Sequence, residues 1–261
     1  MRDDVKELSY PDSGLTVWRC DTAKAVDMAA ADIAEEVIRS EPAGKPGPVL
    51  GLATGSTPEG MYAELVRRHR EKGLSFANVT TFNLDEYVGL YPGHDQSYRH
   101  FMVHQLFMHV DVKYENTFLP SGLEWNMEKH VQEYEELIKA KGGIDLQVLG
   151  IGSNGHIGFN EPGSTRESRT RVVELDEQTR RDNSRFFGND VSKVPTHAIS
   201  MGVGTVLEAK KIILMAKGEG KADAIARSVK GRPTPEVPAS LLQRHPDCTF
   251  ILDPGAASRL E

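Results

Sequence analysis

Residues 49–60 read VLGLATGSTPEG, an apolar run followed by a Gly/Ser/Thr turn and a proline. A short, continuous apolar run is typical of a strand buried on both faces of a parallel sheet. Proline fits the first turn of a helix. The stretch therefore predicts a strand over 49–53, a tight turn, and a helix from Pro58 to about residue 72. Repeated strand–turn–helix units of this kind build α/β folds.

The same alternation of short apolar runs and longer amphipathic stretches continues along the chain. Because strands separated by helices need crossover connections, it predicts an α/β fold with a mostly parallel sheet. Nothing in the sequence marks a second domain, so residues 1–261 are expected to form one domain. Further strands are expected at 15–18, 79–84, 146–149, 198–201, 212–216 and 249–252. Further helices are expected at 22–39, 97–107, 125–140, 221–229 and 238–244, with one more between 201 and 212.

The composition limits the class of protein. The net charge of the 261 residues is −7 at pH 7, which gives no basic stripe for nucleic acid. No apolar run approaches the roughly 20 residues that cross a bilayer, and the charged N-terminus does not resemble a signal peptide. Cys20 and Cys248, far apart and without CxxC spacing, are expected to be reduced thiols of a cytoplasmic protein. An anionic substrate would have to be held by a few local cations.

One segment interrupts the alternation of strands and helices. Residues 152–190 contain few apolar side chains. A long irregular segment in a compact enzyme is often a lid or an active-site loop, and a surface excursion without function is the alternative. We predict a polar lid here.

Four polar segments directly follow predicted strands, at residues 54–58, 85–87, 150–162 and 217–221. Ligands of open parallel sheets bind outside the carboxyl ends of the strands, so these segments are expected to converge on one site. In the first segment, Thr54, Gly55, Ser56 and Thr57 precede a helix N-terminus. Such a terminus offers free N–H groups and a partial positive charge, which predicts a phosphate cradle, with a simple helix cap as the alternative. It lacks the Gly-Lys ending of a Walker A loop.

The second segment places Asp85 beside Glu86. Neighbouring side chains at a strand end point to opposite faces, so the two carboxylates are not expected to work as an acid–base couple. One of them is expected to face the site, and a solvated turn is the alternative.

The third segment, GIGSNG at 150–155, formally matches a dinucleotide-binding GxGxxG pattern. That pattern must open a helix, whereas HIGFNEPG follows here and stops at a proline, so no NAD site is expected. What remains is a glycine-supported loop that carries His156 and Glu161. A histidine beside a carboxylate suits general acid–base chemistry, and a buried structural histidine is the alternative.

A zinc site is not expected. His100 and His104 are spaced i, i+4 on a predicted helix, but FMV between them contains no catalytic glutamate. A packed or exposed helix face is the simpler interpretation.

Taken together, these segments resemble the glucosamine-6-phosphate deaminase family over about residues 21–253. The resemblance is carried by GLATGSTP at 51–58, FNLDEYVGL at 82–90 and GHIGFNEP at 155–162, with SRTR at 168–171 and NSRFF at 183–187. It implies a Rossmann-like three-layer α/β sandwich. It also implies conversion of glucosamine 6-phosphate to fructose 6-phosphate and ammonia without a metal or a redox cofactor.

The resemblance implies a role for each site residue. Asp85 matches the base that moves a proton from C2 to C1 through an enediol-type intermediate. His156 matches the group that assists opening of the pyranose ring, and Glu161 supports it. The phosphate-binding positions are matched by Thr54, Gly55, Ser56, Thr57, Arg185 and Lys221. A small-molecule sugar phosphate is thus the expected partner, and a homo-oligomer is left open.

Asn154 is a departure, since some members of the family carry aspartate there, and an amide supplies no negative charge to His156. The deaminase has two rival functions. A sugar-phosphate lactonase on the same scaffold should lack the FNEP and DEY segments, and a non-catalytic sensor should lack Asp85 or His156. All of these are present, which favours the enzyme.

Overall fold

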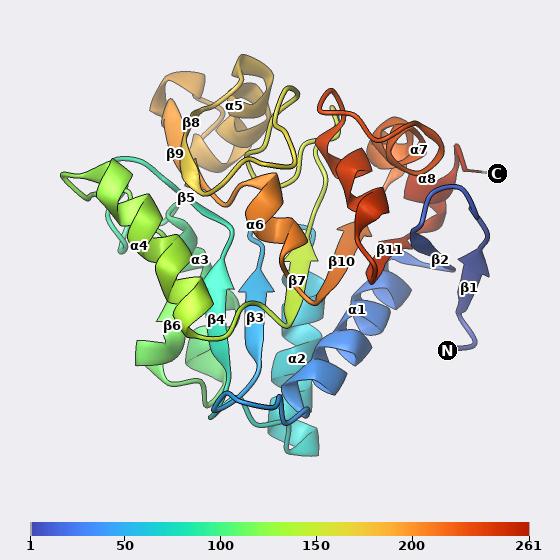
Figure 1. The fold of residues 1–261 in the computed structure, drawn as a ribbon, viewed down its shortest axis with the longest axis horizontal. Helices are drawn as coiled ribbons and strands as arrows, with labels where there is room; N and C mark the ends of the chain where they lie inside the picture. The colour runs from blue at the N-terminus through green and yellow to red at the C-terminus, as the bar shows by residue number, and fades with distance from the viewer. Residues whose placement is uncertain (1, 261) are drawn as a thin grey trace.

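The computed structural model describes residues 2–260 and confirms a three-layer α/β sandwich around a mostly parallel eight-stranded sheet (Figure 1). The strand order is β1-β2-β11-β10-β7-β3-β4-β6, and every pair is parallel except β1–β2. The strands are β1 (Val5–Leu8), β2 (Thr16–Cys20), β3 (Val49–Leu52), β4 (Thr80–Asn83), β6 (Thr117–Phe118), β7 (Leu146–Leu149), β10 (Lys211–Ala216) and β11 (Cys248–Leu252).

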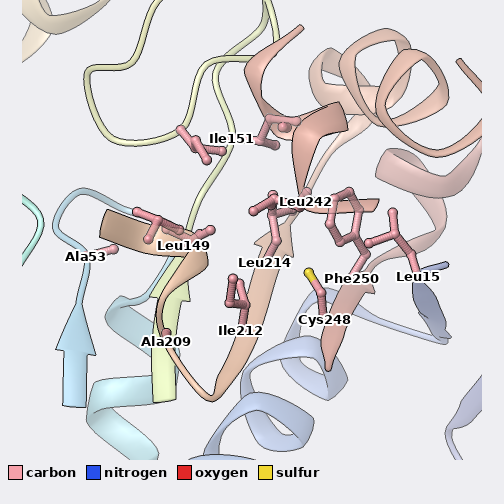
Figure 2. Packing of buried hydrophobic residues seen from close by; sticks show 14 of the residues in the cluster. Leu15, Ala53, Leu149, Ile151, Ala209, Ile212, Leu214, Leu242, Cys248 and Phe250 are labelled. Carbon is pink, nitrogen blue, oxygen red and sulfur yellow. The ribbon is translucent and has the colours of Figure 1, made fainter. Parts of the chain in front are cut away.

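Each face of the sheet buries its own hydrophobic core. Alternate residues of a strand point to opposite faces, so Ile212 and Leu214 of β10 lie in one core and Ile213 and Met215 in the other. The first core also contains Phe250 and is shown in Figure 2. It is covered by α4 (Met127–Ala140), α6 (Val203–Leu207), α7 (Ala222–Lys230) and α8 (Pro254–Ala257). The second is covered by α1 (Ala23–Ile38), α2 (Glu59–Lys72) and α3 (Tyr98–Gln105).

A second, small antiparallel sheet lies beyond the carboxyl end of β4. It consists of β5 (Asp85–Tyr87), β9 (His197–Ser200) and β8 (Arg171–Glu174), in the order β5-β9-β8. The prediction that residues 198–201 belong to the main sheet is therefore wrong. The strand exists, but an apolar run does not encode which neighbour it will pair with, and β9 pairs antiparallel to both partners.

The predicted lid is only partly irregular. Residues 152–170 are mostly turns, whereas the rest contains β8, α5 (Glu177–Asn183) and a 3₁₀ turn at Ser184–Phe187. These elements were missed because they are short and carry few buried apolar residues. Residues 238–244, predicted as a helix of ordinary type, form a 3₁₀ helix that begins at Pro238. The remaining 3₁₀ turns are Phe107–His109, Tyr114–Asn116, Val191–Lys193 and Glu219–Lys221.

Candidate active site

The four polar segments converge as the sequence predicted. They line a cavity of about 470 Å³ at the carboxyl ends of β3, β4, β7 and β10. Residues of α3 and α5 also line it. The residues that come from the four segments include Thr54, Gly55, Ser56, Thr57, Asp85, Tyr87, Gly150, Gly152, His156, Gly158 and Lys221.

The loop between β3 and α2 forms one end of the cavity. Gly55 has φ +85°, a conformation that L side chains rarely adopt, and a side chain at this position would meet no atom within 4 Å. The backbone is therefore open to a ligand. Tyr62 anchors the start of the loop, since its hydroxyl donates to the Ala53 carbonyl oxygen at 2.6 Å. Pro58 provides no side-chain cap for α2, and the first two N–H groups of the helix, those of Glu59 and Gly60, directly follow this loop.

Two cations line the same cavity. Lys221 lies at the end of the turn after β10 and is half-buried. Burial lowers its pKa; the charge of Asp182 raises it, and the charge of Arg185 lowers it further. Arg185 belongs to the turn that follows α5, and its guanidinium carbon lies 4.7 Å from the Phe186 ring centre. The structure thus brings both predicted phosphate cations to one cavity.

Asp85 is the buried carboxylate of the site. It begins β5 and is 5% exposed. Burial, together with the nearby Glu86 carboxylate, raises the pKa of Asp85 to about 8. The loop that carries His156 comes close to it, because a side-chain carbon at Gly158 would lie 3.4 Å from Asp85 Oδ2. A carboxyl group with a near-neutral pKa can both accept and return a proton.

Glu86 faces away from this chemistry, as the strand geometry predicted. Its carboxylate accepts hydrogen bonds from the backbone N–H groups of Tyr98 and Arg99, each at 3.0 Å. It also accepts one from the backbone N–H group of Tyr87, the next residue. The side chain therefore caps α3 and fixes that helix against the small sheet.

His156 is held by its own loop. Its ring lies against Gly152, where a side-chain carbon would come within 2.2 Å of it. Glu161 Oε2 lies 3.3 Å from His156 Nδ1. Burial alone would raise the pKa of Glu161, but contacts with His156, Thr179 and Asn154 lower it to about 2. Glu161 is thus an ionised partner for an imidazolium.

Asn154 reaches Glu161 rather than the histidine ring. Its Nδ2 donates to Glu161 Oε2 at 2.7 Å, and its Oδ1 accepts the His156 backbone N–H at 3.1 Å. The residue orients both members of the pair without adding charge.

The sequence did not reveal the contribution of α5. Thr179 donates to Glu161 Oε1 at 2.5 Å, and Asn183 donates to the Tyr87 hydroxyl at 2.9 Å. These contacts join the predicted lid to the acid–base pair and to β5. Only the NSRFF segment gave a signal here, because Thr179 lies in a polar stretch without a distinctive pattern.

His100 and His104, which the sequence does not predict to bind zinc, lie on α3 (Tyr98–Gln105) with ring centres 3.9 Å apart. His104 Nδ1 lies 2.9 Å from the backbone oxygen of His100. Within residues 2–260, no group of three or more His, Cys, Asp or Glu side chains is placed to hold a metal ion.

A parallel sheet with a polar cavity at the carboxyl ends of its strands defines an α/β protein that binds a small polar ligand. The chain belongs to the family of glucosamine-6-phosphate isomerases and 6-phosphogluconolactonases, whose family model matches residues 21–251.

Curated relatives and solved structures are similar to this protein over most of its length. Glucosamine-6-phosphate deaminase 2 of Giardia intestinalis is 55% identical over 225 residues, covering 86% of this chain and 84% of the relative. The deaminase of Bacillus velezensis is 48% identical over 243 residues, covering 93% and 99%. A structure described as a monomeric glucosamine-6-phosphate deaminase has a TM-score of 0.89 and 44% identity, covering 93% and 99%. The 6-phosphogluconolactonase of Trypanosoma cruzi, at 19% identity and a TM-score of 0.76 over 97% and 98%, shares the fold.

Proposed function

We propose that this chain is a glucosamine-6-phosphate deaminase, which isomerises glucosamine 6-phosphate and releases fructose 6-phosphate and ammonia. Two relatives that are 55% and 48% identical to this chain, both named glucosamine-6-phosphate deaminases, support this function. The observation that carries it is the placement of the buried Asp85 carboxyl group and of His156, which pairs with Glu161, in one cavity with a phosphate-type loop and Lys221.

The phosphate group would occupy the end of the cavity formed by residues 54–57. Backbone N–H groups at the start of α2 and the cations Lys221 and Arg185 supply charge-assisted hydrogen bonds to it. This anchoring holds the sugar in one orientation, so that C1 and C2 lie against the catalytic groups.

Ring opening falls to His156. Neutral imidazole accepts the proton of the C1 hydroxyl, the C1–O5 bond breaks to give the aldehyde, and the imidazolium gives that proton to O5. Glu161, ionised and 3.3 Å away, stabilises the imidazolium that forms. Asn154 and Thr179 hold Glu161 in place.

Asp85 then moves the proton that isomerises the sugar. Its carboxylate takes the proton from C2 while the C1 oxygen takes a proton from the ammonium group on C2, which gives an enolamine. Asp85 then returns its proton to C1, which leaves a protonated imine at C2. Water adds to the imine carbon, and loss of ammonia gives the ketone. Since the same group takes and returns the proton, a pKa near neutrality suits both steps.

The test is the release of ammonia from glucosamine 6-phosphate by the purified protein. We expect stoichiometric fructose 6-phosphate and no hydrolysis of 6-phosphogluconolactone. Lactone hydrolysis without ammonia would indicate the lactonase, and tight sugar-phosphate binding with no turnover would indicate a sensor.

We also propose a cytoplasmic location, supported by Cys20 and Cys248, which are both buried free thiols. No helix within residues 2–260 is long and apolar enough to cross a membrane.

A further inference from the structure

An ion pair outside the cavity joins α1 to the turn after β10, whose last residue, Lys221, lines the cavity. Asp27 of α1 and Lys217, directly after β10, are 190 positions apart in the sequence, and Lys217 Nζ lies 2.6 Å from Asp27 Oδ1. Both side chains are mostly buried, at 15% and 21% exposure. Burying two charges costs free energy, and their mutual attraction offsets that cost only when the geometry is good. A buried ion pair is therefore weak evidence of a stabilising role, and a positioning role has to be considered.

The other carboxylate oxygen of Asp27 lies against the start of α2. A side-chain carbon at Gly60 would fall 2.1 Å from Asp27 Oδ2, so the glycine lets the carboxylate approach the helix. Burial raises the pKa of Asp27, while Lys217 and the backbone N–H of Met61 act in the opposite direction. Met61 occupies the third helical position, whose N–H a capping side chain usually satisfies. Since Pro58 supplies no cap, Asp27 caps α2 from α1, and α1 and α2 pack side by side (Figure 1).

Lys217 begins the turn that ends at Lys221. Asp253 holds the middle of this turn, because both of its carboxylate oxygens accept the Gly218 N–H at 3.0 Å. The bond from Lys217 to Asp27 ties the beginning of the same turn to α1. The position of Lys221 therefore depends on two carboxylates outside the cavity.

We propose that the Asp27–Lys217 pair positions the two halves of the phosphate cradle relative to one another. One carboxylate fixes the start of α2, which follows residues 54–57, and also fixes the turn that carries Lys221. Lys217 has a second effect, since it neutralises an anion that would otherwise weaken the attraction of the helix N-terminus for phosphate. Neither residue lines the cavity, so both act through the groups they hold. This inference rests on the proposed sugar-phosphate function.

The test measures the dissociation constant for inorganic phosphate, together with KM and kcat for glucosamine 6-phosphate, in Lys217→Met, Asp27→Asn and the double variant. Each single change is expected to raise the phosphate dissociation constant and KM by about tenfold, the size of effect that misplaced binding groups cause, with kcat changed by less than about threefold. The double variant should resemble the single ones, because the pair acts as a unit. Lys217→Arg can keep the ion pair, so its phosphate dissociation constant and KM should be close to those of the wild type.

Lys211→Met is the matched control. Lys211 opens the same strand, and its Nζ lies 2.7 Å from Asp247 at the opposite end of the sheet. It should cost a little stability and leave phosphate binding unchanged. A Lys217→Met variant with wild-type phosphate affinity and KM would overturn the proposal, as would an equal loss in Lys211→Met.

Lys221→Ala separates this inference from the function on which it rests. If it binds phosphate as wild type does, the cradle itself is misplaced and the positioning role falls with it. If the Asp27 and Lys217 variants lose phosphate affinity as expected but the wild type releases no ammonia, the positioning role holds and the deaminase function fails.

Discussion

The carboxyl group of Asp85 links catalysis to stability. Its pKa of about 8 lies far above the ordinary value of an unfolded aspartate, because the folded protein buries it. Between these two values the folded state binds the proton more tightly than the unfolded state, so its contribution to stability falls as pH rises from about 4 to 8. The ionised form of Asp85, which acts as the base, therefore lowers the free energy of unfolding.

Asp85→Asn tests both consequences. We expect kcat to fall at least about a hundredfold, as for loss of a general base, and exchange of solvent deuterium into the product to stop. At pH 8 the variant should also unfold at a higher temperature than the wild type, since the buried charge is gone, and at pH 4 the two should be similar. Near-normal turnover, or a destabilised variant at pH 8, would contradict this assignment.

Asn154 tests the electrostatics of the His156–Glu161 pair. An aspartate at this position would put a carboxylate oxygen against Glu161 Oε2, where the amide now donates at 2.7 Å. The added negative charge stabilises a positive charge on His156, and the neutral ring is the form that accepts the C1 proton, so the acidic limb of kcat/KM should move to higher pH. Repulsion from Glu161 should also lower kcat.

Asn154→Ala is the control for this change. It removes the amide donor without adding charge, so it should lower kcat while the acidic limb does not move upward. An unmoved limb in Asn154→Asp would mean that position 154 does not influence the charge on His156.

At the scale of elements, α5 and the turn after it form a wall of the cavity. Arg185→Ala should weaken the binding of inorganic phosphate by about 1.5–3 kcal/mol, the range for hydrogen bonds to charged groups. Arg181→Ala is a suitable control, because Arg181 lies on α5, directly before the turn that carries Arg185, but pairs with Glu177 at 2.7 Å on the exposed surface. Equal losses in the two variants would point to a general charge effect rather than a contact with phosphate.

Local patterns predicted most of the sheet and the four segments of the site. The 49–58 stretch was readable because a strand, a glycine turn and a helix start are each encoded by adjacent residues. The sequence did not predict which strands pair with one another. The apolar run of β9 fits either sheet, and only its contacts with β5 and β8 decide between the two sheets. Some contacts join residues that are distant in sequence, so no local pattern predicts them. Examples are the contact of Thr179 with Glu161 and that of Asp27 with Lys217.

At the scale of the whole molecule, a net charge of −7 gives an anionic substrate no long-range attraction. Binding must come from the local cations and N–H groups of the cradle, and these belong to segments that only the folded chain brings together. A phosphate ion therefore binds the folded state and not the unfolded one. Inorganic phosphate at a hundredfold excess over its dissociation constant should stabilise the protein by about 2.7 kcal/mol.

For a chain of this length that free energy should raise Tm by roughly 5–10 °C. The measurement is thermal unfolding at pH 7.5 with phosphate, and with chloride at matched ionic strength as the control for screening. Chloride should give little shift, because it cannot span the N–H groups of α2 and Lys221 at once. In Lys221→Ala the phosphate shift should shrink by more than half at the same concentration. An equal shift with chloride, or an undiminished shift in Lys221→Ala, would show that phosphate stabilises the molecule through a general salt effect and not through this cavity.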